Sequence, residues 1–112
     1  MQRSEVWKVD LPFTPGHTQA GQRPAVIVQD GPFMAQVPTV LIVPFTSSPR
    51  ATHFPATVLV QPDGQNGLTI PSVALVFQMR AVDQRYCLQR LGVLDSATLD
   101  QILGELDKLT GR

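Results

Sequence analysis

The chain has 112 residues, of which 43% are hydrophobic and 16% charged, and its nine basic and nine acidic residues cancel. This composition predicts a single globular domain over residues 1–112 and excludes a disordered chain. The zero net charge excludes attraction of nucleic acids by a bulk positive field, and the lone Cys87 excludes an intrachain disulfide. Without a signal-peptide pattern or a membrane-length apolar run, the chain is expected to be soluble, cytoplasmic and not bound to membranes.

Most of the chain consists of short apolar runs separated by proline and glycine. Alternation of apolar and polar residues predicts a half-buried strand over 5–11. Near-continuous apolar runs predict buried strands over 25–28, 39–45, 57–60 and 73–79. Asp63-Gly64 and Asn66-Gly67 are typical of turns.

The hydrophobic period changes after residue 95. Apolar residues then recur on one face of a helix, at Leu99, Ile102, Leu103, Leu106 and Leu109. Asp95 or Ser96 can cap the start of this helix, and Gly111 follows its end. The predicted fold is mainly β: a small barrel or strongly bent sheet of about five to seven strands, with a C-terminal amphipathic helix packed on it.

A loop rich in glycine precedes the strand at 25–28. Pro24 favours an extended conformation at Arg23, which places that arginine on a rigid base beside a buried strand. His17 and Gln19 are expected near solvent in the same loop. A purely structural loop explains the glycines and the proline but not the choice of these three side chains, so we consider the loop a candidate functional segment.

Further polar side chains follow the other apolar runs. Thr46 and Ser47 close the run at 39–45, where hydroxyls either contact a ligand or satisfy the backbone of a turn. Arg50 and His53 in the next loop are also candidates, with a solvated loop tip as the alternative. Gln78 and Arg80 are the last two candidates, although Arg80 could instead pair with Asp83.

Charge is unevenly distributed along the chain. Residues 13–58 contain two arginines and two histidines against the single acid Asp30, whereas residues 95–107 contain four acids and no base. Such segregation favours local attraction of a polyanion to the first half of the chain. The two histidines are far apart in sequence and lack a carboxylate pattern, so neither a metal site nor a cofactor is expected. Cys87 is interpreted as a small buried hydrophobe, with a reactive thiol as the alternative.

An ordered set of residues carries a resemblance to a known family. The set comprises Glu5-Val6-Trp7 with Asp10-Leu11, Gly16-His17, Gln19-x-Gly21-x-Arg23-Pro24, Val43-Pro44-Phe45-Thr46-Ser47, Ser72-Val73, Gln78-x-Arg80, Val82-Asp83 and Leu91-Gly92. In this order and at these spacings it resembles the MazF/PemK/Kid family of toxin endoribonucleases. The resemblance implies an SH3-like barrel, a symmetric homodimer, metal-independent cleavage of single-stranded RNA, and neutralisation by a cognate antitoxin. The gyrase-poisoning toxin CcdB shares that fold, so the fold alone does not decide the target.

The resemblance also implies roles for individual residues. Arg23 and Thr46 match the family positions most associated with cleavage, and Gln19, Ser47 and His17 match positions used around the RNA. Thr18 and Phe77 stand where many members carry a carboxylate. With those acids missing, we hypothesise that His17 transfers the proton, because histidine titrates at about pH 6.5. The predicted catalytic residues are thus Arg23, Thr46 and His17, and the predicted RNA-binding residues are Gln19, Ser47, Arg50, His53, Gln78 and Arg80.

Two other interpretations remain open at this stage. The same barrel could hold an antitoxin, RNA or gyrase without cutting, an interpretation that Thr18 and Phe77 favour and that Arg23 and Thr46 oppose. A purely structural barrel leaves the ordered loop residues unexplained. If the chain is a toxin, its antitoxin is expected to present an acidic, partly disordered segment to the basic loops.

Overall fold

The computed structural model describes residues 1–12, 16 and 19–112. Within them lie seven strands: β1 (Glu5–Leu11), β2 (Gly21–Ile27), β3 (Thr39–Thr46), β4 (Thr57–Val60), β5 (Ser72–Leu75), β6 (Arg80–Asp83) and β7 (Cys87–Val93). One α-helix, α1 (Ser96–Leu109), follows, and four 3-10 turns occupy Gly31–Phe33, Pro49–His53, Val76–Gln78 and Gln84–Tyr86. The mainly β fold with a C-terminal helix is confirmed.

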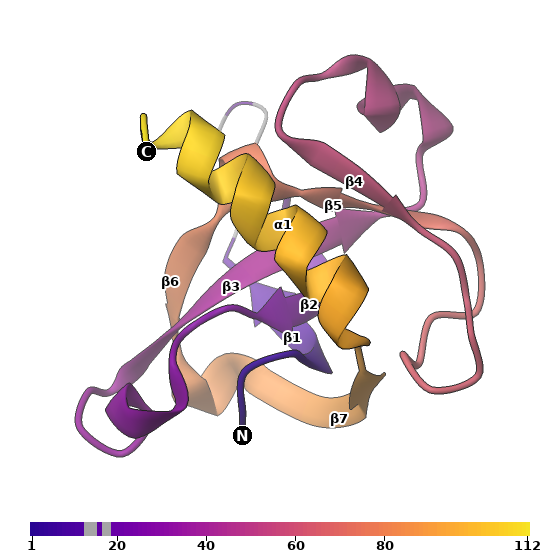
Figure 1. The fold of residues 1–112 in the computed structure, drawn as a ribbon. Coiled ribbons are helices and arrows are strands. Elements are labelled where there is room, and N and C mark those ends of the chain that lie inside the picture. The colour runs from indigo at the N-terminus through magenta and orange to yellow at the C-terminus, as the bar shows by residue number, and fades with distance from the viewer. Residues whose placement is uncertain (13–15, 17–18) are drawn as a thin grey trace.

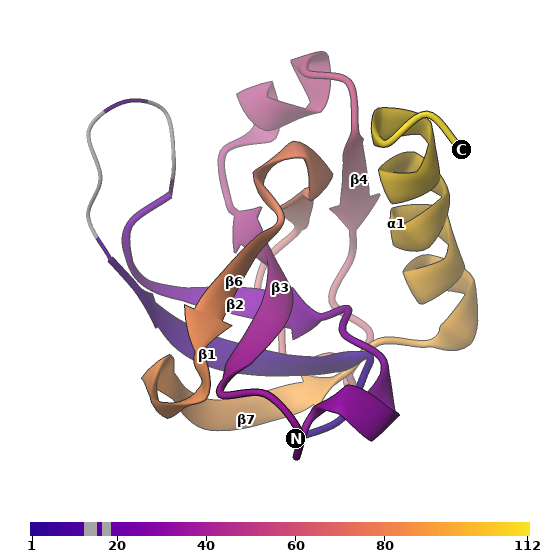
Figure 2. The ribbon, with the colours of Figure 1, turned by 90° about the vertical axis from the view of Figure 1, so that its left-hand side faces the viewer.

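All strands pair antiparallel in the order β4-β5-β3-β2-β1-β7, and β6 also pairs with β3. Strand β3 is the centre of this arrangement because it pairs with three strands: residues 39–42 with β6, residues 42–44 with β2, and its last two residues with β5. The strongly bent sheet stays open, since β4 and β7 stand at opposite ends of the order. Figure 1 shows α1 crossing in front of the bent sheet, and Figure 2 shows the helix along one side, next to β4.

Both faces of β3 are buried, which explains its unbroken apolar run. Val43 and Phe45 belong to a core that also contains Ile102 of α1, whereas Val40 and Ile42 belong to a second core on the other face. A strand covered on both sides needs no polar face, so the alternation seen in β1 is absent from β3.

Helix α1 matches the predicted boundaries closely. Asp95 caps it, with its carboxylate accepting a hydrogen bond from the Thr98 backbone N–H at 2.7 Å. Ile102 is fully buried and anchors the helix on the sheet, while Leu109 at the other end is 52% exposed. No helix within the described residues is long and apolar enough to cross a membrane.

The prediction of one strand over 73–79 is wrong. Strand β5 ends at Leu75, and the N–H groups of Val76 and Phe77 both donate to the carbonyl of Ala56. This contact turns the chain through the 3-10 turn at Val76–Gln78 before β6 begins at Arg80. The periodicity did not reveal the break because the turn is itself built of apolar residues.

Strand β7 was not predicted from the hydrophobic pattern. It lies at the end of the strand order and pairs only with β1 among the described strands, and residues 88–90 are exposed. An edge strand of this kind lacks the apolar signal of a central one. Cys87 at its start is half-buried, and burial raises the pKa of its thiol, which opposes the reactive-thiol alternative.

Candidate functional site

Arg23 and Thr46 line one pocket of about 330 Å³, here called the Arg23 pocket. Ala25 pairs with Pro44 at the end of the β2–β3 ladder, and Arg23 and Thr46 each lie two residues beyond this pair on their strands. Ser47 and Phe45 line the pocket as well. The structure therefore brings together the two predicted catalytic residues that it describes, although they lie far apart in the sequence.

The Arg23 side chain is held by the backbone of the loop before it. Its Nε donates to the Ala20 carbonyl at 3.0 Å, and the residue is half-buried. Because the guanidinium is planar and always charged, fixing Nε also fixes the plane in which its Nη donors lie. Arg23 is thus suited to binding an anion in this pocket.

Thr46 serves the turn and the pocket together. The side chain is 8% exposed, and its Oγ1 accepts a hydrogen bond from the Ser48 N–H at 3.3 Å. A hydroxyl that accepts one bond still carries a proton to donate. The turn-stabilising alternative and a donor role are therefore compatible in this residue.

Residues 67–70 and Leu91 also line the Arg23 pocket, and the sequence did not predict them as part of the site. Gly67 has a φ of +74°, and a β-carbon at this position would overlap the Leu91 backbone. Asn66 is 1% exposed; its amide accepts from the Leu68 N–H at 3.0 Å and donates to the Gln61 carbonyl at 2.9 Å. The turn signal at Asn66-Gly67 was visible in the sequence, but its place beside β7 was not.

The residues of the Gln-x-Arg element clamp the loop that carries Gln19. The Gln19 N–H donates to Gln78 Oε1 at 2.8 Å, and Arg80 Nη2 donates to the Gln19 carbonyl at 2.6 Å. Burial lowers the pKa of Arg80 below the ordinary arginine value. Asp83, the alternative partner considered for Arg80, instead pairs with Arg85 at 3.5 Å. Two motifs that are about sixty residues apart thus form one structural unit.

A second pocket of about 390 Å³ adjoins the first and is here called the Phe77 pocket. Thr46 lines both pockets, so they meet at the end of β3. Its other lining residues include Gln19, Arg50, Phe54, Phe77 and Gln78. Of the predicted RNA-binding residues, Gln19, Arg50 and Gln78 therefore line the Phe77 pocket, and Ser47 lines the Arg23 pocket.

The remaining predicted residues have other positions. His53 is exposed in the turn at Pro49–His53 and lines neither pocket. Arg80 lies behind Gln19 rather than among the lining residues of either pocket. His17 and Thr18 fall outside the described residues, so the hypothesis that His17 transfers the proton stays a prediction.

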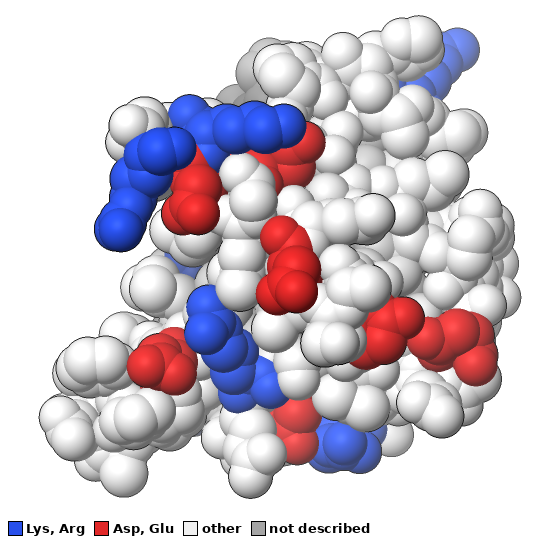
Figure 3. Space-filling model, in the orientation of Figure 1, with Lys and Arg blue, Asp and Glu red and all other residues white. Residues whose placement is uncertain are grey.

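The charge around the site is positive or neutral. Among the described lining residues of the Arg23 and Phe77 pockets there is no Asp or Glu, whereas each pocket contains one arginine. The acids gather elsewhere: Figure 3 shows them along α1, with basic side chains near its C-terminal end. This distribution follows the uneven charge along the sequence.

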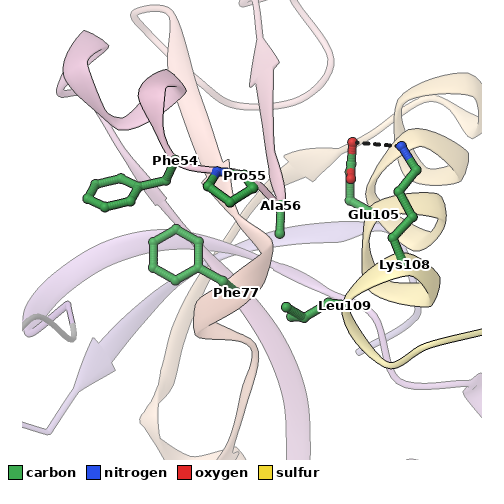
Figure 4. A pocket seen from close by; sticks show the side chains of 7 residues that line it. All are labelled: Phe54, Pro55, Ala56, Phe77, Glu105, Lys108 and Leu109. Carbon is green, nitrogen blue, oxygen red and sulfur yellow. Dashed lines mark hydrogen bonds and ion pairs between the residues drawn. The ribbon is translucent and has the colours of Figure 1, made fainter.

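A third hollow lies on the other side of the aromatic pair, towards α1. It measures about 480 Å³ and is lined mainly by apolar side chains, among them Phe54, Phe77 and Leu109. Figure 4 shows the two phenylalanine rings on one side of this hollow and Leu109 on the other, with Lys108 paired to Glu105 on α1. It contains none of the predicted site residues.

Comparisons with known proteins agree with this arrangement. A family model for the PemK-like, MazF-like toxins of type II toxin–antitoxin systems matches residues 2–110. The endoribonuclease PemK of Escherichia coli is 31% identical over 110 residues, covering 97% of this chain and 81% of the relative. Among solved structures, MazF from Deinococcus radiodurans superposes with a TM-score of 0.84 at 22% identity, covering 100% of this chain and 97% of that one.

A further solved structure is described as an endoribonuclease in complex with its cognate antitoxin from a mycobacterial species. It has a TM-score of 0.78 at 22% identity and covers 99% of this chain and 95% of its own. At such identities the solved structures support the fold alone. The family model and the PemK relative support membership of the family. The chain therefore belongs to the PemK-like, MazF-like toxins of type II toxin–antitoxin systems.

Proposed function

We propose that this chain is the toxin of a type II toxin–antitoxin system and cleaves single-stranded RNA, including mRNA, without a metal ion, thereby inhibiting translation and growth. The observation that carries the proposal is that Arg23 and Thr46 line one pocket free of acids among its described residues. Such a pocket suits a phosphodiester, because a fixed guanidinium and a hydroxyl both donate to phosphate oxygens. The relatives named as endoribonucleases support the same activity.

The chemistry requires no nucleophile from the protein. The ribose 2′-hydroxyl attacks the phosphorus and loses its proton to a base, for which we propose His17. The bond from phosphorus to the 5′-oxygen breaks, that oxygen takes up a proton from water, and His17 later releases its proton to water. The products are a 2′,3′-cyclic phosphate and a 5′-hydroxyl end. Arg23 stabilises the charge that builds on the phosphate oxygens, which is usually the largest contribution to such catalysis.

The test of activity is incubation with a long RNA in EDTA, followed by mapping of the new ends. Arg23→Ala is expected to lower the rate by about 10²–10³-fold without unfolding the protein. Arg85→Ala is the matched control, since Arg85 is exposed and pairs with Asp83 away from both pockets. Equal cleavage by the Arg23 and Arg85 variants contradicts the catalytic role of Arg23. An absence of cleavage by the wild type contradicts the nuclease activity and favours the alternative of a binding module.

His17 is tested by the pH dependence of the same reaction. If it is the base, the rate titrates near the ordinary histidine pKa, and both His17→Ala and His17→Gln remove that titration. His17→Gln keeps a hydrogen-bonding side chain, so a retained rate in this variant means that His17 only contacts the RNA. The two substitutions together separate proton transfer from binding.

We further propose a homodimer and an antitoxin with an acidic, partly disordered segment. A relative solved with its cognate antitoxin supports the partner, and Arg23 and Arg50 offer it positive charge. Leu59 of β4 and Leu109 of α1 are about half exposed on neighbouring elements, which supports self-association. Light scattering at micromolar concentration tests the dimer, and competition between the antitoxin and RNA tests the shared surface.

A further inference from the structure

An aromatic pair forms one wall of the Phe77 pocket. The ring centroids of Phe54 and Phe77 are 5.4 Å apart at an interplanar angle of 46°, and Figure 4 shows the two rings adjacent. Phe54 is 58% exposed, while Phe77 is half-buried against the small cluster of Ala51, Val73 and Leu75. A large exposed ring held against a fixed one offers a flat apolar surface to a ligand.

The same pocket contains an acceptor that has no donor in the part of the chain that the structure describes. Gln19 Oε1 is buried and has no hydrogen-bond partner among the described residues. The Gln19 backbone is fixed at its N–H by Gln78 and at its carbonyl by Arg80, so the position of the side chain is restricted. A buried acceptor of this kind is expected to take an N–H from a ligand.

A nucleobase meets both requirements, because every base has a π-face and carries N–H groups on its edge. A protein segment would bring its apolar side chains and its backbone N–H groups as separate groups, whereas a base carries a π-face and N–H donors on one flat ring. Thr46 lines both pockets, so an occupant of the Phe77 pocket lies next to a phosphate bound at Arg23. Arg50 on the rim adds positive charge for the neighbouring backbone.

We propose that the Phe77 pocket binds one base of single-stranded RNA, which stacks on Phe77 and donates an N–H to Gln19 Oε1. The inference rests on the proposed function, because it places the base beside the phosphate of the cleavage site. It gives Phe77, which the resemblance marks only as a departure from the family pattern, a role of its own as a stacking platform.

The experiment measures binding apart from cleavage. The probes are fluorescein-labelled 2′-O-methyl RNA octamers of A, C and U, which cannot undergo 2′-hydroxyl attack, and an abasic 2′-O-methyl octamer of equal charge. Fluorescence anisotropy gives Kd for each. Because stacking on an aromatic side chain is worth about 1–3 kcal/mol per base, Phe77→Leu is expected to weaken the tightest base-bearing octamer by about 5–150-fold. Binding of the abasic octamer stays unchanged.

Two variants keep the result interpretable. Phe77→Tyr retains the π-face and is expected to restore binding, and Phe54→Leu removes the more exposed ring if Phe77→Leu proves unstable. Gln19→Leu keeps the backbone clamp, and the loss of one hydrogen bond is expected to weaken base-bearing octamers by about 2–10-fold. Phe33→Leu is the matched control, since Phe33 is 52% exposed in the turn at Gly31–Phe33 and lines neither pocket.

Three results overturn the inference: no binding of base-bearing RNA by the wild type, equal binding by wild type and Phe77→Leu, or an equal loss for the abasic octamer. The second of these results would leave the rings as a surface for a protein partner instead. The proposed function fails separately. A protein that binds bases through Phe77 but leaves RNA uncut refutes cleavage alone, whereas cleavage with unchanged Phe77→Leu binding refutes the base subsite alone.

Discussion

Arg80 was predicted from the sequence to bind RNA, whereas in the structure its Nη2 donates to the Gln19 carbonyl at 2.6 Å. We expect Arg80 to act by holding the loop before β2 rather than by contacting a phosphate. The perturbation that separates these roles is Arg80→Met, which keeps an apolar stem of similar length and removes the charge and all donors. Arg50→Met is the matched comparison, because Arg50 is exposed and lines the Phe77 pocket.

Two opposing effects set the magnitude for Arg80→Met. A hydrogen bond from a charged donor contributes about 1.5–3 kcal/mol, which the substitution removes. Against this, burial lowers the pKa of Arg80, and its buried Nε has no partner among the described residues. Removing that partly desolvated charge offsets part of this loss. The free energy of global unfolding is therefore expected to fall by less than the full contribution of the bond.

The local effect at Gln19 is larger because only the bond is lost there. Opening of the clamp becomes easier by about 1.5–3 kcal/mol, so exchange of the Gln19 amide hydrogen is expected to accelerate by about 10–150-fold. The slope of log K against log salt for binding of 2′-O-methyl RNA is expected to stay the same. In Arg50→Met, loss of one phosphate contact reduces that slope by about 0.7.

Hydrogen exchange by NMR, urea unfolding and a salt titration of RNA binding test this assignment together. If the salt slope of Arg80→Met falls as much as that of Arg50→Met, Arg80 binds a phosphate and the sequence prediction was right. If the Gln19 amide exchanges at the wild-type rate, the 2.6 Å bond does not stabilise the loop. Either result refutes the positioning role.

Three further predictions concern the frame around the site. Asn66→Ala leaves the Leu68 N–H and the Gln61 carbonyl without partners and is expected to cost about 2–4 kcal/mol in urea unfolding; a cost near zero means that water replaces the amide. Gly92→Ala places a β-carbon against the Gln65 carbonyl and is expected to lower stability by about 1–3 kcal/mol. Gly104→Ala lies in open space on α1 and is expected to raise stability by up to about 1 kcal/mol. Similar Tm values for the two variants contradict the close approach of β7 to the backbone at residues 65–67. Hydrogen bonds from Thr98 hold the pKa of Asp95 below its ordinary value, so the stability that the ionised carboxylate adds is present at neutral pH and is lost as the pH falls through the lowered pKa. Asp95→Asn still caps the helix and is expected to flatten this part of the dependence of Tm on pH.

The elements predicted best from the sequence are those with one dominant local signal. The alternation over Glu5–Leu11 and the helical face ending at Leu109 both depend on spacing within the element itself. The break after Leu75 and the edge strand β7 were missed for a tertiary reason. The first depends on the distant carbonyl of Ala56, and the second is held by pairing with β1 and carries exposed side chains.

The candidate site was predictable as a set of residues but not as a geometry. The motifs around Gln19 and Gln78 were each visible in the sequence, yet their roles differ: the side chain of Gln78 and that of Arg80 fix the backbone of Gln19. Neither motif predicts these two hydrogen bonds, because each of them joins a side chain to a backbone group. The same holds for the wall at 67–70, which approaches Arg23 only because Gly67 and Gly92 let two backbones come close.

Thr46 connects these observations. It is the last residue of β3, which pairs with β6 and β2 over residues 39–44 and exchanges them for β5 over its last two residues. The strand leaves the core at that point: Thr46 is 8% exposed, whereas Ser47, the next residue, is exposed. Arg23 reaches Thr46 from β2, and Phe77 reaches it from the turn that follows β5. A phosphate and its neighbouring base would thus be bound on the two sides of one residue, which ties the position of the site to the exchange of partners in the sheet.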